Sequence, residues 1–155
     1  MSRAAVCALW IAVTLAAGAA RADFMRGLEA FDGGDFATAH AEWLAAAEDG
    51  VTDAQTSLAE LYLQGLGVRR DAAAGAGWYR RAAESGDPVG QLNLGDLYAR
   101  GVGVDRDLVM AHLWLSLAAA QGRTWAANRR AEIEAAMTAT ERDRARVLYR
   151  SRQGG

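Results

Sequence analysis

LGDLYARGVGV, residues 94–104, repeats the pattern of LAELYLQGLGV, residues 58–68, with an offset of 36 residues. The same spacing separates Gly50, Gly86 and Gly122, which indicates that an earlier copy precedes these two. Repetition at a fixed period of about 20 to 50 residues is typical of repeat proteins, in which successive units stack on one another. Such proteins present an extended surface, so the sequence favours binding over catalysis.

Each copy predicts two short helices joined by a glycine-containing loop. Leu58, Leu61 and Tyr62 follow one another at i, i+3 and i+4, the spacing of one helical face. Gly65 then predicts the end of the helix, because the residue that follows a helix often needs a positive φ. Asp71 precedes an alanine-rich run, where its carboxylate can cap a second helix. The sequence therefore predicts an all-α chain of antiparallel helix pairs.

Further signals mark the helix ends and the core. Three residue pairs are typical of a helix N-terminus: the capping box Thr52 with Gln55, the cap and proline Asp87 with Pro88, and the capping box Thr138 with Glu141. The last pair predicts a terminal helix to about residue 150, with Ala145, Leu148 and Tyr149 inward and arginines on a polar outer face. This helix is expected to cap the stack. The core of the second helices is predicted to contain Trp43, Trp78 and Trp114.

The first 22 residues have the organisation of a secretory signal peptide. Arg3 supplies a positive charge, residues 4–17 are uncharged and mostly apolar, and Ala20-Arg21-Ala22 matches an A-x-A cleavage site. Cleavage is expected between Ala22 and Asp23, which predicts a periplasmic or secreted protein. A membrane anchor is the alternative, and it is disfavoured because the apolar run is shorter than about 18 residues. No membrane span is expected after cleavage.

The composition excludes several kinds of chemistry. Cys7 is the only cysteine and lies in the predicted signal segment, so disulfides and cysteine zinc sites are not expected after it. The chain has no lysine, which excludes a Schiff-base lysine and a Walker A lysine. His40 and His112 are two periods apart, too far to share a metal if the units stack at ordinary helix spacing. No metal, cofactor or catalytic residue is therefore predicted.

Charge is distributed unevenly along the chain. Residues 23–68 contain one arginine and nine acidic residues, whereas residues 69–155 contain 14 arginines and 10 acidic residues, so the net charges are −8 and +4. Ordinary variation in surface charge is the simpler interpretation, and electrostatic orientation of a partner is the alternative. Nucleic acid is not expected as a partner, because the chain is predicted to be exported and acidic residues interrupt its arginines.

Residues 94–104, followed by Asp107, Ala111, Trp114 and Gly122, form a long pattern of fixed positions. This pattern resembles the Sel1-like repeat, a relative of the tetratricopeptide repeat. The resemblance implies a right-handed α-solenoid of antiparallel helix pairs, whose first helices line a concave surface. It covers nearly all of the chain after residue 22.

The resemblance divides the chain into five segments. We expect a signal peptide at 1–22, a degenerate first repeat at 23–53, Sel1-like repeats at 54–89 and 90–125, and C-terminal capping helices at 126–155. The repeat at 90–125 matches best, and the repeat at 54–89 departs from the pattern at Ala59 and Gly75.

The same resemblance implies a function. Its members are mostly adaptors, so we expect a non-enzymatic adaptor that binds a protein or peptide partner in the cell envelope on its concave face. One alternative is a cell-wall hydrolase or β-lactam-binding protein like the cysteine-rich branch of the family, which the lack of later cysteines disfavours. Another is a chaperone-like or inhibitory subunit of an envelope enzyme.

The candidate partner-binding residues are positions of the first helices that the resemblance places on the concave face. In the two clear repeats and near the entry to their first helices they are Asp53, Thr56, Glu60, Gln64, Val89, Leu92, Asp96 and Arg100. Arg26 and Glu29 are plausible continuations in the first repeat. The alternative for all of them is an ordinary solvated helix face.

Overall fold

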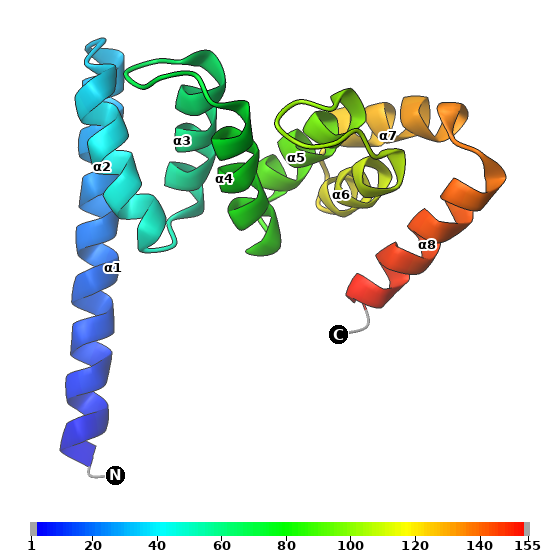
Figure 1. The fold of residues 1–155 in the computed structure, drawn as a ribbon. Helices are drawn as coiled ribbons and strands as arrows, with labels where there is room; N and C mark the ends of the chain where they lie inside the picture. The colour runs from blue at the N-terminus through cyan, green and yellow to red at the C-terminus, as the bar shows by residue number, and fades with distance from the viewer. Residues whose placement is uncertain (1–2, 154–155) are drawn as a thin grey trace. The chain divides into compact units, whose positions relative to one another are not determined.

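The structure, a computed structural model, describes the backbone of residues 3–153 and the side chains of residues 18–153. Within residues 3–153 it contains eight α-helices and no strand (Figure 1). The predicted all-α repeat solenoid is thus confirmed as a fold class. The helices are α1 (Arg3–Asp32), α2 (Phe36–Glu48), α3 (Thr52–Gln64), α4 (Ala72–Glu84), α5 (Pro88–Arg100), α6 (Leu108–Ala120), α7 (Thr124–Ala136) and α8 (Ala139–Gln153).

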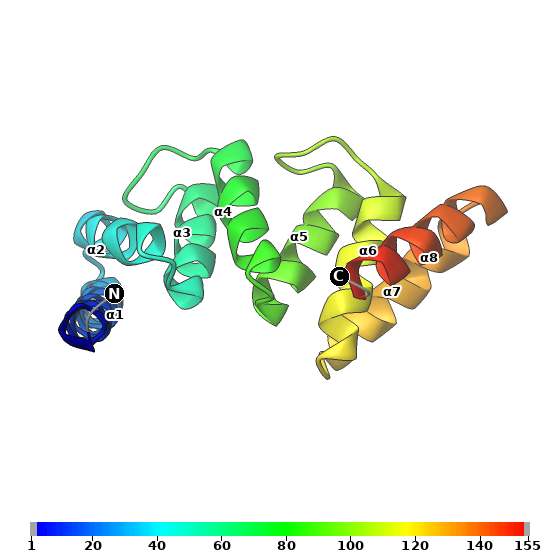
Figure 2. The ribbon, with the colours of Figure 1, turned by 90° about the horizontal axis from the view of Figure 1, so that it is seen from below.

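The chain divides into two compact units, Met1–Arg70 and Asp71–Gly155. In unit 1, α2 packs against both α1 and α3. In unit 2, α5 packs between α4 and α6, and α6 also contacts α7 and α8, as Figure 2 shows for α5, α6 and α7. The backbone of α1 continues as helix through the predicted cleavage position at Ala22 and Asp23. Residues 1 and 2 of the predicted signal peptide, and the side chains of residues 3–17, lie outside the described residues.

Glycines end the first helix of each clear repeat, as predicted. Gly65 follows α3 and Gly101 follows α5, both in the left-handed region, with φ of 76° and 69°. Their backbone N–H groups donate hydrogen bonds to the carbonyls of Leu61 and Leu97, both at 2.8 Å. These bonds satisfy carbonyls that have no partner inside the helix.

The second glycine of each loop makes a contact that the sequence did not predict. A Cβ atom on Gly67 would lie 2.4 Å from the carbonyl of Phe36, the first residue of α2. One period later, a Cβ atom on Gly103 would lie 2.0 Å from the carbonyl oxygen of Ala72, the first residue of α4. Only a residue without a side chain allows the two backbones to approach so closely.

Most of the predicted caps are present. The Asp87 carboxylate accepts a hydrogen bond of 2.6 Å from the N–H of Gly90, and Pro88 occupies the first position of α5. Thr138 and Glu141 form the predicted reciprocal pair before α8, with bonds of 2.8 Å and 3.2 Å between the side chain of each and the backbone N–H of the other.

The capping box predicted at Thr52 and Gln55 is wrong. Val51 is the cap residue of α3, and no side chain bonds to the N–H groups of this helix end. Gln55 is buried and donates its amide Nε2 to the carbonyl of Ala47, at 3.1 Å. Gln91 repeats this contact one period later with the carbonyl of Ala83, at 3.4 Å. These glutamines tie each first helix to the end of the preceding helix, which explains why the residue type recurs.

The predicted tryptophan core needs correction. The large buried side chains at one phase of the second helices are Trp43, Tyr79 and Leu115, which are 36 residues apart. Trp78 is only half-buried, and the Arg81 guanidinium lies 4.6 Å from its ring centre. Trp114 is buried, partly because α8 covers α6 and places the side chain of Arg152 over its ring.

The terminal helix α8 is oriented differently from the prediction. Ala145 is fully buried as expected, but Leu148 is 37% exposed and Tyr149 is only half-buried. Arg142, predicted on the outer face, instead donates its Nη1 to the carbonyl of Met137 at 2.6 Å, just beyond α7. Satisfying this helix end turns the side chain inward, so the outer face is less polar than predicted.

The burial pattern predicts unequal effects of two adjacent aromatic truncations. Tyr79→Ala should lower the free energy of unfolding by about 3–5 kcal/mol, as for other buried aromatic residues. Trp78→Ala should lower the free energy of unfolding by roughly half as much or less, because the Trp78 ring is already partly exposed to water. Urea denaturation of both variants beside the unmodified protein measures the difference. Equal losses, or a larger loss at Trp78, would mean that the buried position of α4 is assigned incorrectly.

Candidate functional site

The four candidate residues of unit 1 lie on α3. Asp53, Glu60 and Gln64 are exposed, and Thr56 is half-buried. Thr56 donates its hydroxyl to the carbonyl of Asp53 at 3.0 Å, and Gln64 donates its amide to Glu60 Oε2 at 2.9 Å. Because they follow one another at three- or four-residue intervals, these side chains share one face of the helix. Part of this face is thus organised by local hydrogen bonds.

The four candidate residues of unit 2 lie on α5, in a different environment. Val89 and Leu92 are half-buried, and Leu92 packs against the hydrophobic core of this unit. Asp96 is half-buried and Arg100 is exposed. Leu92 therefore contributes to the core as well as to the surface.

Asp96 is the centre of a group of four charged residues, which we name the α5–α7 ion cluster. Its carboxylate pairs with Arg100 at 3.1 Å and with Arg129 of α7 at 3.0 Å. Arg129 also pairs with Glu132 at 2.8 Å. The hydrogen bond to Glu132, together with the weaker effect of Asp96, raises the pKa of the Arg129 guanidinium. These contacts order the side chains before any partner arrives.

Sequence reasoning missed Arg129 and Glu132, because α7 lies beyond the two clear repeats. One of the two, Glu132, could have been found from the 36-residue period. Glu60, Asp96 and Glu132 are 36 residues apart, so an acidic residue occupies the same phase of α3, α5 and α7. Nothing in the sequence pattern marks Arg129.

The two residues expected to extend the site into the first repeat lie on α1. Arg26 is exposed and pairs with Glu42 of α2 at 2.9 Å, and with the Asp23 carboxylate. The hydrogen bond to Glu42 is the main reason that the pKa of Arg26 is raised. Glu29 is exposed on the same helix.

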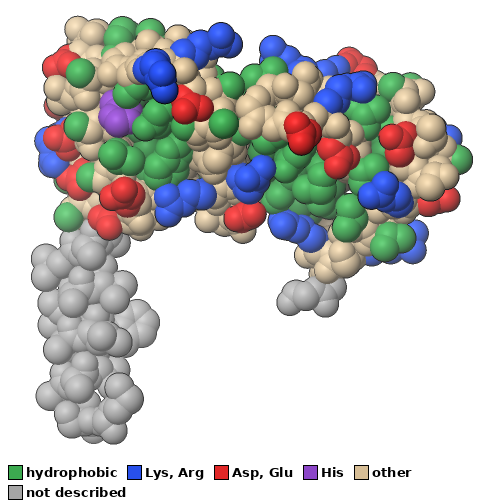
Figure 3. Space-filling view, viewed as in Figure 1, with side chains coloured by type: hydrophobic (Ala, Val, Ile, Leu, Met, Phe, Trp, Pro, Cys, Tyr) green, Lys and Arg blue, Asp and Glu red, His purple; other side chains and the backbone are tan. Residues whose placement is uncertain are grey.

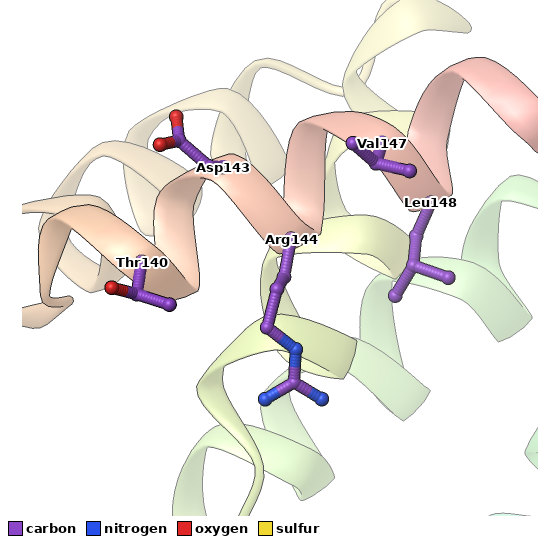
Figure 4. Close-up of a pocket in the computed structure, with 5 residues that line it drawn as sticks. All are labelled: Thr140, Asp143, Arg144, Val147 and Leu148. Atoms are coloured by element: carbon purple, nitrogen blue, oxygen red, sulfur yellow. The ribbon is translucent and has the colours of Figure 1, made fainter.

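Both units contain surface pockets. One, of about 240 Å³, lies between α1, α2 and α3 and is lined by Leu28, Phe31, Asp32, Trp43, Ser57 and Glu60; we name it the α1–α3 pocket. The other, of about 430 Å³, follows α8 along Thr140, Asp143, Arg144, Val147 and Leu148. Figure 4 shows Arg144 and Leu148 extending from the same side of that helix. Of the candidate site residues, Glu60 alone lines the α1–α3 pocket.

The two histidines have separate surroundings. His40 Nε2 lies 3.0 Å from the hydroxyl of Tyr62, and His112 Nε2 lies 3.6 Å from the carboxylate of Glu134. Within the part of the chain that the structure describes, no three His, Cys, Asp or Glu side chains gather in a way that would hold a metal ion.

Comparison with known proteins identifies the family. The family described as Sel1 repeat matches residues 52–87 and 88–122. A Sel1 repeat protein from Oxalobacter formigenes has 36% identity and a TM-score of 0.69, over 74% of this chain and 90% of that one. This chain is a Sel1-repeat protein. Sel1-repeat proteins are generally non-enzymatic scaffolds, and their fold is typical of adaptors in protein–protein interactions.

Two further solved structures resemble this Sel1-repeat protein. A protective antigen of uropathogenic Escherichia coli strains, described as displaying an SLR fold, has 32% identity and a TM-score of 0.81. The match covers 85% of this chain but only 29% of that antigen. The cysteine-rich protein B of Helicobacter pylori has 22% identity and a TM-score of 0.63, over 77% and 92% of the two chains, which shows a shared fold alone. None of the curated proteins matches the chain.

No helix in the described part of this Sel1-repeat protein combines the length and the apolar character that crossing a membrane requires.

Burial of His112 predicts a pH dependence of stability. Burial lowers the pKa of its imidazole, the neighbouring Glu134 opposes this, and Arg130 and Arg146 lower the pKa further. The folded protein therefore binds fewer protons than the unfolded chain just below the ordinary histidine pKa of about 6.5. Stability should fall as the pH drops from 7 towards 5, above the range where carboxylates titrate, and His112→Asn should reduce this loss. Thermal unfolding across this pH range measures it.

His40 provides the control for this experiment. Burial also lowers the pKa of His40, so His40→Asn should remove only its own contribution and leave that of His112. A pH dependence that is identical in His112→Asn and in the unmodified protein would contradict the assignment.

Proposed function

We propose that this Sel1-repeat protein is a non-enzymatic adaptor of the periplasm or the extracellular space. It binds a protein or peptide partner on the face formed by its first helices, which includes Asp53, Thr56, Glu60, Gln64, Val89, Leu92, Asp96 and Arg100. The observation that carries the proposal is the acidic position that recurs at Glu60, Asp96 and Glu132.

Side-chain order on this face supports the proposal. In unit 1, Gln64 donates a hydrogen bond to Glu60. In unit 2, Arg100 and Arg129 form ion pairs with Asp96. Side chains that are already ordered lose less conformational entropy on binding, which favours affinity. The exposed members of the face keep donors and acceptors at the surface, where a polypeptide partner can reach them.

The proposed location rests on residues 1–22. Their charge, apolar run and A-x-A sequence are those of an exported protein. The lack of cysteine after this segment is compatible with an oxidising compartment. An adaptor in this location would bind its partner in the cell envelope or outside the cell.

Site-specific photocrosslinking tests the binding face. A photoreactive residue such as benzoylphenylalanine is introduced at Gln64 or Arg100, which are exposed and occupy equivalent positions at the ends of α3 and α5. Matched controls carry it at Glu48 or Glu84, exposed and equivalent positions at the ends of α2 and α4. Irradiation of producing cells should yield adducts with a defined protein from the first pair. Adducts from the control pair alone, or from none of the four, would contradict the proposed face.

The N-terminus of the exported protein tests the location. Expression of the full chain should give a protein in the periplasm or medium that begins at Asp23, as measured by fractionation and mass spectrometry of the intact protein. Recovery only inside the cell with residues 1–22 retained would refute export.

A further inference from the structure

The α1–α3 pocket of unit 1 is lined by both apolar and acidic residues. Leu28, Phe31 and Trp43 supply apolar surface, while Asp32 and Glu60 supply carboxylates. Its volume of about 240 Å³ is smaller than the roughly 300–1,000 Å³ of pockets that bind whole small molecules. The pocket is therefore of a size that suits one side chain of a larger partner.

The aromatic wall is fixed by contacts within unit 1. Trp43 donates its indole N–H to the carbonyl of Phe24 at 3.2 Å, and its ring centre lies 5.4 Å from that of Phe31. The indole rests on Gly27, where a Cβ atom would lie only 2.4 Å from the ring. These three contacts hold the indole in one orientation, so the wall exists before a ligand enters.

The surroundings of the pocket favour a cation. Residues 23–70 of unit 1 contain nine acidic residues and three arginines, a net charge of −6. One of these arginines, Arg26, is paired with Asp23 and Glu42. Figure 3 shows one face of the protein, on which hydrophobic side chains of unit 1 lie exposed among both acidic and basic side chains. A cleft with one sign of charge raises the local concentration of oppositely charged groups.

The residue of unit 2 that is equivalent to Glu60 shows which cation a carboxylate at this position of the repeat binds. Asp96 lies one period after Glu60 and binds two guanidinium groups, those of Arg100 and Arg129. In unit 1 the residue equivalent to Arg100 is Gln64, whose amide is one of the groups that Glu60 contacts. A carboxylate has about four lone-pair positions and accepts several donors at once.

We propose that the α1–α3 pocket binds an arginine or lysine side chain from a basic segment of the partner protein. The methylene stem lies along Leu28, Phe31 and Trp43, and the cationic head reaches Asp32 and Glu60. Long basic side chains have this combination of an apolar stem and a charged end. Aromatic faces also attract cations, and hydrogen bonds between charged groups are stronger than neutral ones. This inference rests on the proposed adaptor function and specifies its partner.

A pair of peptides tests the inference. One is acetyl-Ala-Ala-Arg-Ala-Ala-amide, and the other contains citrulline, which has nearly the shape of arginine without its charge. Each is titrated into the ¹⁵N-labelled purified protein, and the indole N–H signal of Trp43 is followed by NMR. The arginine peptide should shift this signal and the amide signal of Ser57 in a saturable way. The dissociation constant of the citrulline peptide should be at least about tenfold higher than that of the arginine peptide.

Neutral variants identify the carboxylates. Asp32→Asn and Glu60→Gln, alone and together, should weaken binding of the arginine peptide, whereas the controls Glu48→Gln and Asp49→Asn remove acidic groups outside the pocket and should not. Dispersed amide signals show that each variant is folded, and Asp32→Asn, at the exposed end of α1, provides the least disruptive change. Equal binding of the two peptides, or equal effects of pocket and control variants, would overturn the proposal.

This experiment is separable from the test of the function. If photocrosslinking captures a protein but the Trp43 signal does not respond to the arginine peptide, the adaptor function stands and the pocket assignment is wrong. A saturable response that depends on Asp32 and Glu60 supports the pocket even where the crosslinked residues lie elsewhere on the face.

Discussion

The structure depends on one backbone contact that recurs with the period of the sequence. The second glycine of each loop lies against the first residue of an earlier helix, Gly67 against Phe36 and Gly103 against Ala72. Because each contact leaves no room for a Cβ atom, it sets how closely the loop approaches the first turn of the earlier helix. Burial of the alanine and leucine side chains between the helices within each unit requires this close approach.

Equivalent positions on α3 of unit 1 and α5 of unit 2 have different surroundings. Glu60 lines a pocket with aromatic walls, whereas Asp96 is held in the α5–α7 ion cluster. The repeat thus supplies the same carboxylate position in both units. A residue whose type differs between repeats, Trp43, and a residue beyond the two clear repeats, Arg129, decide what surrounds it. A regular repeat can thus give equivalent positions of its two units different chemical surroundings.

Local signals in the sequence predicted the helices well, because a period and a glycine or aspartate at a helix end act through the nearby backbone. Contacts between elements were harder to predict. Leu148 was assigned inward from its phase alone, although only the packing of α8 decides its exposure. Gln55 was interpreted as a cap because its spacing fits, yet its amide bonds the preceding helix. The α1–α3 pocket was missed because Phe31 and Asp32 belong to the repeat with the weakest pattern.

The second loop glycine is required for contact as well as for backbone conformation. Urea denaturation of Gly103→Ala beside Gly122→Ala tests it most directly, because both glycines have positive φ but only Gly103 has neighbouring atoms within 4 Å of an added Cβ. Gly122→Ala should lower the free energy of unfolding by about 1–2 kcal/mol, because alanine is strained at a positive φ. Gly103→Ala should cost roughly 1–3 kcal/mol more, because the helices must separate. Equal losses for the two variants would contradict the account.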